Sequence, residues 1–432
     1  MIEKAPESKM SIEVLGLLMN SKEKEAIDKV NRDYLYWDKA KYFVPEGVKP
    51  EVFWSAIKIS RSMQSKMLEF PCCNVKYNET LFIQEALHGF DIRFSDVLPS
   101  SKTISEKNKQ YYQISSIMEE AIASSQMEGA STTREVAKEM LRKQKKPKDQ
   151  SQQMILNNYN TIIYLSNRKD KPLSADLLLD VHRHITDKTL ENPEDEGRFR
   201  NDDRIVVQNG ITGEIVHRPP TWSLIEPSVK SICDFINADE QFVHPILKAI
   251  ILHFMISYLH PFVDGNGRTA RSLFYWYMLK KGYWLTEFLS ISRIIYREKA
   301  QYERSFQYTE SDGMDLNYFL TFNLKVMEKA FSELQRYLDR KASEENALLE
   351  FRIPGINERQ AEIIRMVNKN SNVILIIKEL ERVLNVSVKT IRSDLEVLVQ
   401  MGLLDRVPMN KRLVGYTKSS AFESRLKELR EK

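Results

Sequence analysis

Residues 245–281 limit the fold more than any other part of the chain. The segment PILKAIILHFMISYLH begins at Pro245, is apolar for most of its length, and is followed by the loop HPFVDGNG and a second long periodic run. An average strand has about 5 to 6 residues, and proline is common in the first turn of a helix. The segment therefore predicts a helix, a glycine-rich loop and a second helix.

The same loop satisfies the relaxed dinucleotide-binding pattern GxGxxA, and Glu287 follows at about the spacing of a ribose-binding acid. That pattern requires a strand before the glycines. Because a helix is predicted there, we reject a dinucleotide-binding fold.

The rest of the chain is also predicted to be mainly helical. The 432 residues include only 14 glycines, about half the usual share, and long stretches are rich in helix-forming residues. Two runs with β-branched residues flank the turn signals of QNGITG, and this predicts a β-hairpin over 204–217. The helices are expected at 107–142, 152–168, 174–188, 223–238, 245–259, 268–281, 293–308 and 315–348.

Residues 356–432 have the pattern of a winged helix-turn-helix domain. Three helical segments follow Pro354 and Gly355, and LLDRVPMNKRLVGYTK could form a two-stranded wing. Ser387 would cap the recognition helix, on which Lys389, Thr390 and Arg392 would meet DNA. Winged helices also bind proteins, so both partners stay open.

Composition sets weaker limits on compartment and partners. The three cysteines show no CxxC spacing, which favours a reducing compartment. No apolar run reaches the about 20 residues of a membrane span, and the N-terminus does not resemble a signal peptide. We therefore expect a cytoplasmic protein without a membrane partner. The net charge of +4 is too small to indicate a nucleic-acid partner, so any basic surface must be confined to a part of the protein.

The loop over 260–271 carries groups that suit a phosphate. The backbone N–H groups of Gly265, Asn266 and Gly267 can point inward at the start of a helix, whose positive end attracts anions. Arg268 and Arg271 are three residues apart and hence lie on one helical face, where guanidinium groups match phosphate oxygens.

Two further side chains of the loop suit catalysis. Asp264 beside a polyphosphate suits Mg²⁺, and His260 could accept a proton from a hydroxyl group at neutral pH. Together these groups predict phosphoryl or nucleotidyl transfer. The other histidines, His182, His184 and His253, lack partners at metal-ligand spacing and are expected to pack or cap helices.

HPFVDGNGRTAR resembles the signature of Fic-domain proteins, HPFx[DE]GNGRxxR, at every fixed position. The resemblance implies transfer of AMP from ATP to a hydroxyl group of a target protein. His260 would then be the base and Asp264 the Mg²⁺ ligand, while Arg268 and Arg271 would bind the triphosphate. Asn266 and the N–H groups of Gly265 and Gly267 would hold the phosphates.

Two other segments extend the resemblance. GRFR at 197–200 and the hairpin at 204–217 resemble the family's flap, which holds a target segment as an added strand. The flap residues expected to dock the target are Arg204, Ile205, Val206, Val207, Ile215 and Val216.

SSQMEG at 124–129 resembles the family's inhibitory-helix motif, within a helix expected at about 115–130. Ser124 and Glu128 would share a helical face, and Gly129 completes the motif. We expect Glu128 to occupy the guanidinium of Arg271, with the Ser124 hydroxyl helping to seat the carboxylate.

The sequence thus predicts a mainly α protein adenylyltransferase with a Fic-type core, a β-hairpin flap and a C-terminal winged helix. Its substrates would be ATP with Mg²⁺ and a protein carrying a Ser, Thr or Tyr hydroxyl. Two alternatives remain, namely removal of AMP with Glu128 positioning water, and a DNA-binding regulator whose core senses nucleotide. A homodimer stays open. The expected parts are a helical scaffold at 1–104, the Fic domain at 105–325, a linker helix at 326–355 and the winged helix at 356–432.

Overall fold

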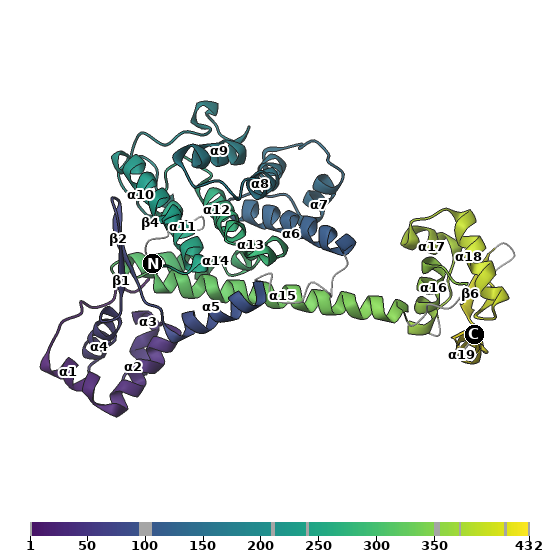
Figure 1. Cartoon of the computed structure of the whole chain (residues 1–432), viewed down its shortest axis with the longest axis horizontal. Coiled ribbons are helices and arrows are strands. Elements are labelled where there is room, and N and C mark those ends of the chain that lie inside the picture. The colour runs from purple at the N-terminus through teal and green to yellow at the C-terminus, as the bar shows by residue number, and fades with distance from the viewer. Residues whose placement is uncertain are drawn as a thin grey trace. The chain divides into compact units, whose positions relative to one another are not determined.

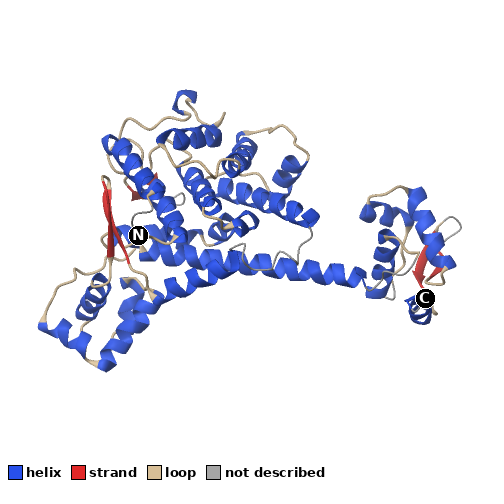
Figure 2. Ribbon diagram, in the orientation of Figure 1, coloured by secondary structure: helices blue, strands red, loops and turns tan. Residues whose placement is uncertain are grey.

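A computed structural model describes residues 2–94, 106–208, 212–238, 242–349, 355–370, 373–409 and 413–430. These residues are mainly helical, and they include three antiparallel sheets of two strands each (Figures 1 and 2). The chain divides into two compact units, Met1–Leu334 and Gln335–Lys432. A membrane span would need about 20 apolar residues in one helix, and no helix within the described ranges meets that requirement.

The first part of the N-terminal unit is a cluster of helices with an aromatic core. Ser11 caps the first helix by accepting a hydrogen bond from Val14 N–H, and Pro50 occupies the first turn of the fourth. Trp54 and Phe53 are buried in the core. The elements are α1 (Ile12–Met19), α2 (Ser21–Asp33), α3 (Trp37–Ala40), η1 (Lys41–Phe43), α4 (Pro50–Ser62), β1 (Lys66–Phe70), β2 (Cys73–Tyr77) and α5 (Leu81–Phe94).

The hairpin of β1 and β2 corrects the expectation of a purely helical region at 1–104. β1 ends at Phe70 and β2 begins at its partner Cys73, so Pro71 and Cys72 alone form the turn. Two-residue hairpin turns are dominated by Asn-Gly and other glycine pairs. Because this turn has neither signal, sequence reasoning missed the hairpin.

Two central helices form the core of the N-terminal unit. α11 (Pro245–Leu259) has the predicted bounds and is apolar on all sides, as is typical of a helix in the interior of a large core. α12 (Asn266–Lys280) packs along it, and nearly all of its residues are buried. The surrounding elements are α6 (Glu106–Met127), α7 (Arg134–Arg142), α8 (Gln150–Ser166), α9 (Ala175–Thr186), η3 (Pro193–Asp195), η4 (Trp222–Leu224) and α10 (Ile225–Asn237).

Two segments predicted as single helices are each interrupted. In 107–142, α6 ends at Met127 and Gly129 adopts φ 97°, a left-handed conformation typical of helix ends. In 293–308, Glu298 breaks the helix with φ −113° and ψ 30°, without a glycine or proline to signal it. The elements of this part are η5 (Trp284–Phe288), α13 (Ile291–Arg297), α14 (Lys299–Ser311) and α15 (Asn317–Leu349).

The hairpin predicted at 204–217 is present, but its strands are short. β3 (Val207–Gln208) pairs antiparallel with β4 (Ile215–His217), and the register shifts between the two residues of β3. Arg204, Ile205 and Val206 precede the strand. The predicted turn includes residues 209–211, which lie outside the described residues.

The C-terminal unit has the predicted order of three helices and a two-stranded wing. Ser387 caps the third helix, as predicted, by accepting a hydrogen bond from Thr390 N–H at 3.3 Å. Ile364 and Leu395 are fully buried in a separate apolar core. A helix after the wing was not predicted. The elements are α16 (Glu358–Lys369), α17 (Ile377–Leu384), α18 (Val388–Gln400), β5 (Leu404–Pro408), β6 (Val414–Lys418) and α19 (Phe422–Arg430).

Candidate active site

The loop between α11 and α12 has a left-handed residue at each end. His260 ends α11 with φ 49° and ψ 57°, a conformation uncommon for residues other than glycine. Gly265 precedes α12 with φ 78°, and a Cβ there would lie 2.9 Å from the Thr186 side chain. Only glycine satisfies both constraints. Because α12 begins here, the N–H groups of its first three residues have no acceptor inside the helix, as an anion site requires.

Asn266 and Phe262 close the loop on itself. The amide oxygen of Asn266 accepts from Phe262 N–H at 3.0 Å, and its amide nitrogen donates to Phe262 O at 2.9 Å. Both polar groups of this side chain are thus used inside the loop. The prediction that Asn266 holds phosphates stays a prediction.

His182 supports the loop from α9. Its ring stacks on Phe262 with centroids 3.7 Å apart. Nδ1 accepts from Gly197 N–H at 3.0 Å, and Nε2 lies 2.9 Å from the Asp264 carbonyl oxygen, so Nε2 carries the proton. Burial lowers the pKa of His182 to about 4, which keeps the ring neutral. This is the packing role expected for His182.

Arg268 and Asp264 form the floor of the loop. The Arg268 side chain is fully buried and donates to Ile185 O at 3.3 Å and to Asp264 Oδ2 at 3.2 Å. The Asp264 side chain remains 55% exposed, and its Oδ1 has no hydrogen bond within the described part of the chain. One carboxylate oxygen is therefore open to a cation.

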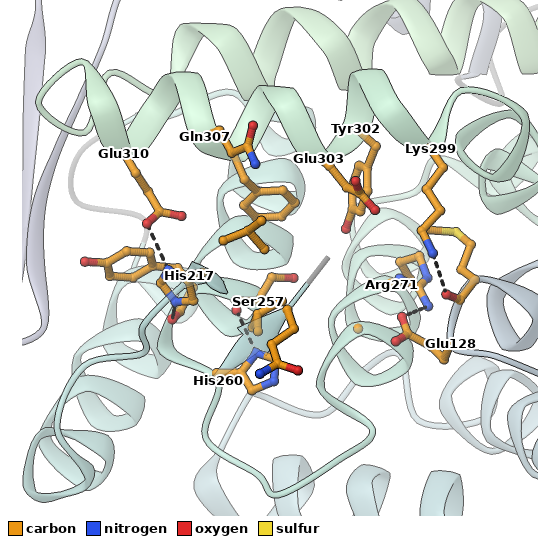
Figure 3. Close-up of a pocket in the computed structure, with 17 residues that line it drawn as sticks. Glu128, His217, Ser257, His260, Arg271, Lys299, Tyr302, Glu303, Gln307 and Glu310 are labelled. Carbon is orange, nitrogen blue, oxygen red and sulfur yellow. Dashed lines mark hydrogen bonds and ion pairs between the residues drawn. The ribbon is translucent and has the colours of Figure 1, made fainter. Parts of the chain in front are cut away.

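His260 is prepared to accept a proton. Its Nδ1 lies 3.2 Å from the carbonyl oxygen of Ser257, and a carbonyl can only accept, so Nδ1 carries the proton and Nε2 keeps its lone pair. Burial lowers the pKa of His260 to about 4. Arg200 fixes the backbone by donating from Nε to His260 O at 2.9 Å. His260 is thus a neutral acceptor at pH 7, and Figure 3 shows its contact with Ser257.

The pair of Glu128 and Arg271 expected from the sequence is present. Arg271 donates from Nη2 to Glu128 Oε1 at 2.8 Å. It also donates from Nε to Ser124 Oγ at 2.8 Å and from Nη2 to Ser124 O at 3.0 Å. The Arg271 side chain is 2% exposed and the Glu128 side chain 29%. The expected role of Ser124 is therefore corrected, because its hydroxyl orients the guanidinium and does not touch the carboxylate.

The carboxylate of Glu128 lies over the start of α12. A Cβ added to Gly267 would collide with Glu128 Oε1, so the carboxylate occupies the space directly above this glycine. Burial alone would raise the pKa of Glu128, but the charge and hydrogen bond of Arg271 lower it below its usual value. Glu128 is therefore an anion above the start of α12, where the sequence predicts phosphate oxygens.

Contacts that sequence reasoning missed hold α6 in this position. Glu120 is buried and accepts from Tyr275 OH at 2.7 Å, from Ser290 Oγ at 3.1 Å and from Ser292 N–H at 3.0 Å. Burial outweighs these bonds and raises the pKa of Glu120. The available signal was spacing, since Glu120 lies four residues before Ser124 and shares its helical face.

Lys299 holds the C-terminal end of α6. Its Nζ donates to Met127 O at 3.3 Å, at the last residue of α6. A cation at the C-terminal end of a helix is favoured by the helix dipole. Lys299 thus supports the turn that carries Glu128 (Figure 3).

A cavity of about 370 Å³ joins these groups. His260, Glu128 and Arg271 line it together with Ser257 (Figure 3). The opposite wall is one face of α14, which sequence reasoning missed although its residues recur at spacings of three and four. The remaining lining residues are Met127, Val207, Gln208, Val216, His217, Tyr258, Gly267, Lys299, Tyr302, Glu303, Phe306, Gln307 and Glu310.

His217 attaches β4 to the wall of the cavity. Its Nδ1 lies 2.9 Å from Glu310 Oε2, and its Nε2 lies 2.8 Å from Tyr258 O. Of the residues predicted to dock a target, Val207 and Val216 line the cavity. The others lie outside it, namely Arg204, which pairs with Asp202 and is 88% exposed, Ile205 and Val206, which are half-buried, and Ile215, which is exposed.

The predicted recognition helix α18 presents its basic residues to solvent. Lys389 and Arg392 are exposed, and no ion pair involves either among the described residues. Thr390 contacts the capping Ser387 with the two hydroxyl oxygens 2.9 Å apart. Ile391 is fully buried on the opposite face. The geometry therefore leaves both cations available to phosphates.

Two family models match the chain. Residues 172–278 match the Fic/DOC family and residues 359–408 match a DeoR-like helix-turn-helix domain. The first match begins after α6, so it does not include the predicted inhibitory helix.

Curated relatives and a solved structure are similar to this chain. The protein adenylyltransferase Fic of Nematostella vectensis is 29% identical over 27% of this chain and 25% of its own length. That of Culex quinquefasciatus is 31% identical over 28% and 22%. The chain thus spans about a quarter of the length of these relatives. A Fic family protein from Desulfovibrio desulfuricans shares the fold, with a TM-score of 0.52 at 18% identity, over 79% of this chain and 97% of that one. The chain therefore carries a Fic domain, and a DeoR-like helix-turn-helix domain follows it.

Proposed function

We propose that the protein is an adenylyltransferase that moves AMP from ATP to a serine, threonine or tyrosine hydroxyl of a target protein. The observation that carries the proposal is one cavity in which three groups meet. These are the neutral acceptor nitrogen of His260, the free N–H groups at the start of α12 and the guanidinium of Arg271. Relatives of the Fic domain bear the name protein adenylyltransferase, which supports the same reaction.

The reaction requires a base and an anion site. The target oxygen would attack the α-phosphorus, a new oxygen–phosphorus bond would form, and the bond to the β-phosphate would break, releasing pyrophosphate. The hydroxyl proton would pass to His260 Nε2. The N–H groups of Gly265, Asn266 and Gly267 would hold phosphate oxygens, while Arg271 would face the γ-phosphate.

Mg²⁺ fits the residues that are present. Mg²⁺ binds through one or two carboxylates together with substrate phosphates and water. Asp264 offers one exposed carboxylate oxygen beside the phosphate loop. When bound, the ion would neutralise charge on the phosphates, and Arg268 would keep the Asp264 side chain in place.

Glu128 would hold the enzyme in a slow state. Its carboxylate occupies both the Arg271 fork and the space above Gly267. A triphosphate entering the cavity would lose the guanidinium contact and bend away from in-line geometry. Ser124 and Gly129 would support this state by orienting Arg271 and by turning the chain after α6.

Removal of AMP from a modified protein is the second candidate. Glu128 and His260 line the same cavity, and the Glu128 side chain is 29% exposed. Its carboxylate could orient a water molecule toward a phosphorus atom held at the loop. The position of Glu128 suits either role, so the experiment below measures both directions.

The flap and the C-terminal domain would select partners. A target segment would add to the edge of the β3–β4 hairpin. The DeoR-like domain would bind DNA through Lys389, Thr390 and Arg392. The alternative function, a DNA-binding regulator whose core only senses nucleotide, would need this domain but would not need His260. The proposed domain limits are 1–104, 105–325, 326–355 and 356–432.

The decisive experiment uses α-labelled ATP, Mg²⁺ and a cell lysate. The full-length protein and its Glu128→Gly and His260→Ala variants are incubated separately, and labelled bands are identified by mass spectrometry. Labelling that rises in Glu128→Gly and vanishes in His260→Ala supports the transferase. Loss of AMP removal from a labelled target in Glu128→Gly, with no rise in labelling, supports the reverse reaction.

A further inference from the structure

Two adjacent cysteines lie at the turn between β1 and β2. Cys72 is the second turn residue and Cys73 is the first residue of β2. Their sulfur atoms are 3.8 Å apart, and both side chains are only partly buried. The third cysteine, Cys233, is buried on α10. The function proposed above uses neither residue of the pair.

The surroundings make the two thiols unequal. The Cys73 thiol hydrogen bonds to Cys72 and lowers the pKa of Cys72 to about 7. The Ser228 hydroxyl also lowers the pKa of Cys72, and this hydroxyl is buried and makes no hydrogen bond within the described residues. The pKa of Cys73 is raised, first by its hydrogen bond to Cys72 and then by burial. At neutral pH a large share of Cys72 is therefore thiolate, while Cys73 stays a thiol.

We infer that Cys72 and Cys73 are a redox-active vicinal dithiol, which exchanges reversibly with low-molecular-weight disulfides. The Cys72 thiolate attacks one sulfur of the disulfide, a mixed disulfide forms, and the first small thiolate leaves and takes a proton from water. Cys73 then attacks the Cys72 sulfur, and its proton goes to the second leaving thiolate. Two protein thiols are oxidised and one disulfide is reduced to two thiols.

Covalent geometry makes the product easy to reduce. Neighbouring Cα atoms lie about 3.8 Å apart across a trans peptide bond, whereas disulfides usually join Cα atoms about 4.4–6.8 Å apart. A disulfide between Cys72 and Cys73 would be strained, and strained disulfides have more oxidising potentials. The bond is therefore suited to reversible exchange rather than to permanent cross-linking.

The dithiol is electrostatically coupled to two residues that hold β4. Glu310 contributes to the raised pKa of Cys73, and both cysteines contribute to the raised pKa of Tyr258. Glu310 and Tyr258 are the two partners of His217 on β4.

The hairpin is also tied to the chain just after α14. Lys76 N–H donates to Met314 O at 3.0 Å, and Leu316 N–H donates to Lys76 O at 2.8 Å. We predict that a strained ring at the turn shifts β2 and, through Glu310 and Tyr258, loosens β4. The role of β4 in docking a target rests on the proposed function. The predicted loosening of β4 on oxidation is independent of that function.

The first experiment is a mass measurement on the full-length protein. The reduced protein is incubated with glutathione disulfide and then digested with trypsin, which places both cysteines in the peptide MLEFPCCNVK, residues 67–76. The expected product is this peptide lighter by two hydrogen atoms and restored by dithiothreitol. A stable glutathione adduct, an intermolecular disulfide or an unmodified peptide would each overturn the inference.

Two single variants test the order of events. Cys73→Ser should stop at the mixed disulfide on residue 72, and Cys72→Ser should react far more slowly. Cys233 is an internal control, since burial raises its pKa to about 11 and it should stay reduced. Equal reaction of the two variants would contradict the assigned roles.

Hydrogen–deuterium exchange tests the connection to β4 without any assay of AMP transfer. Backbone amides of 215–217 should exchange faster in the oxidised protein than in the reduced one. Cys72→Ser treated in the same way should show no change. If the disulfide forms but the amides of 215–217 do not exchange faster, the link to the flap is refuted. The redox activity of Cys72 and Cys73 would still be supported.

Discussion

Replacement of Glu128 is the most informative perturbation of the site. In Glu128→Gly the hydrogen bond to Arg271 Nη2 disappears and the space above Gly267 opens. Ser124 still accepts from Arg271 through its hydroxyl and its carbonyl. The guanidinium should therefore stay oriented toward the cavity and become available to a γ-phosphate.

The magnitude follows from the kind of bond that is lost. A hydrogen bond to a charged group contributes about 1.5–3 kcal/mol. The Glu128 side chain is 29% exposed, so solvent screening favours the lower part of that range. A change of about 1.4 kcal/mol corresponds to tenfold in rate. Labelling of the protein itself or of its target should thus rise at least tenfold.

The assay compares initial rates of AMP incorporation from labelled ATP. Glu128→Gln is the milder test, because it keeps the shape and removes the charge. Glu119→Gln on α6 is its matched control, since Glu119 pairs with Arg134 and Lys138 and does not line the cavity. Unchanged rates in both Glu128 variants, with ATP binding intact, would refute the inhibitory role.

The remaining predictions concern the base, the loop, the DNA-binding helix and acid stability. His260→Ala should abolish AMP transfer and leave ATP affinity within a few-fold by calorimetry; full activity would exclude it as the base. Gly267→Ala should fold normally, because the added Cβ meets the ends of the Glu128 and Arg271 side chains and no backbone atom. It should not transfer AMP even without the inhibitory carboxylate, because its methyl group covers the phosphate loop. If α18 binds DNA, Lys389→Gln and Arg392→Gln should each lower the salt slope of the full-length protein's DNA affinity by about 1, and no binding at low salt would favour a protein partner. Burial lowers the pKa of His253 to about 3, whereas its unfolded value is about 6.5, so the unfolded chain binds more protons as the pH falls below 6.5. Stability should then decrease by about 2 kcal/mol at pH 5 for this residue, and denaturant unfolding of His253→Phe between pH 7 and 5 should show a correspondingly smaller loss.

The sequence was sufficient to predict features that depend on interactions between residues close together in the chain. The bounds of α11 follow from its length, its apolar character and Pro245 at its start. The cap of α18 follows from a hydroxyl that can reach an N–H three residues ahead. The loop over 260–271 could be recognised as an anion site from the sequence. Its glycines act through N–H groups that are adjacent in the chain, and its two arginines lie three residues apart on one helical face. The pair of Glu128 and Arg271 was accessible only through resemblance to a known motif, since 143 residues separate its members.

Tertiary structure alone decided the contacts between distant segments. The break at Glu298 and the hairpin at residues 66–77 have no glycine where the chain turns, so packing between segments decided them. The face of α14 is periodic in the sequence, but only the fold places it on the cavity. The hydrogen-bond partner of the Ser124 hydroxyl differed from the expectation for the same reason. The sequence places its hydroxyl on the face of Glu128, but only the folded chain brings Arg271 close enough to take that hydroxyl as its acceptor. Sequence thus determined which chemical groups the loop carries, and the packing of α6 against α12 determined that an anion of the chain itself lies among them.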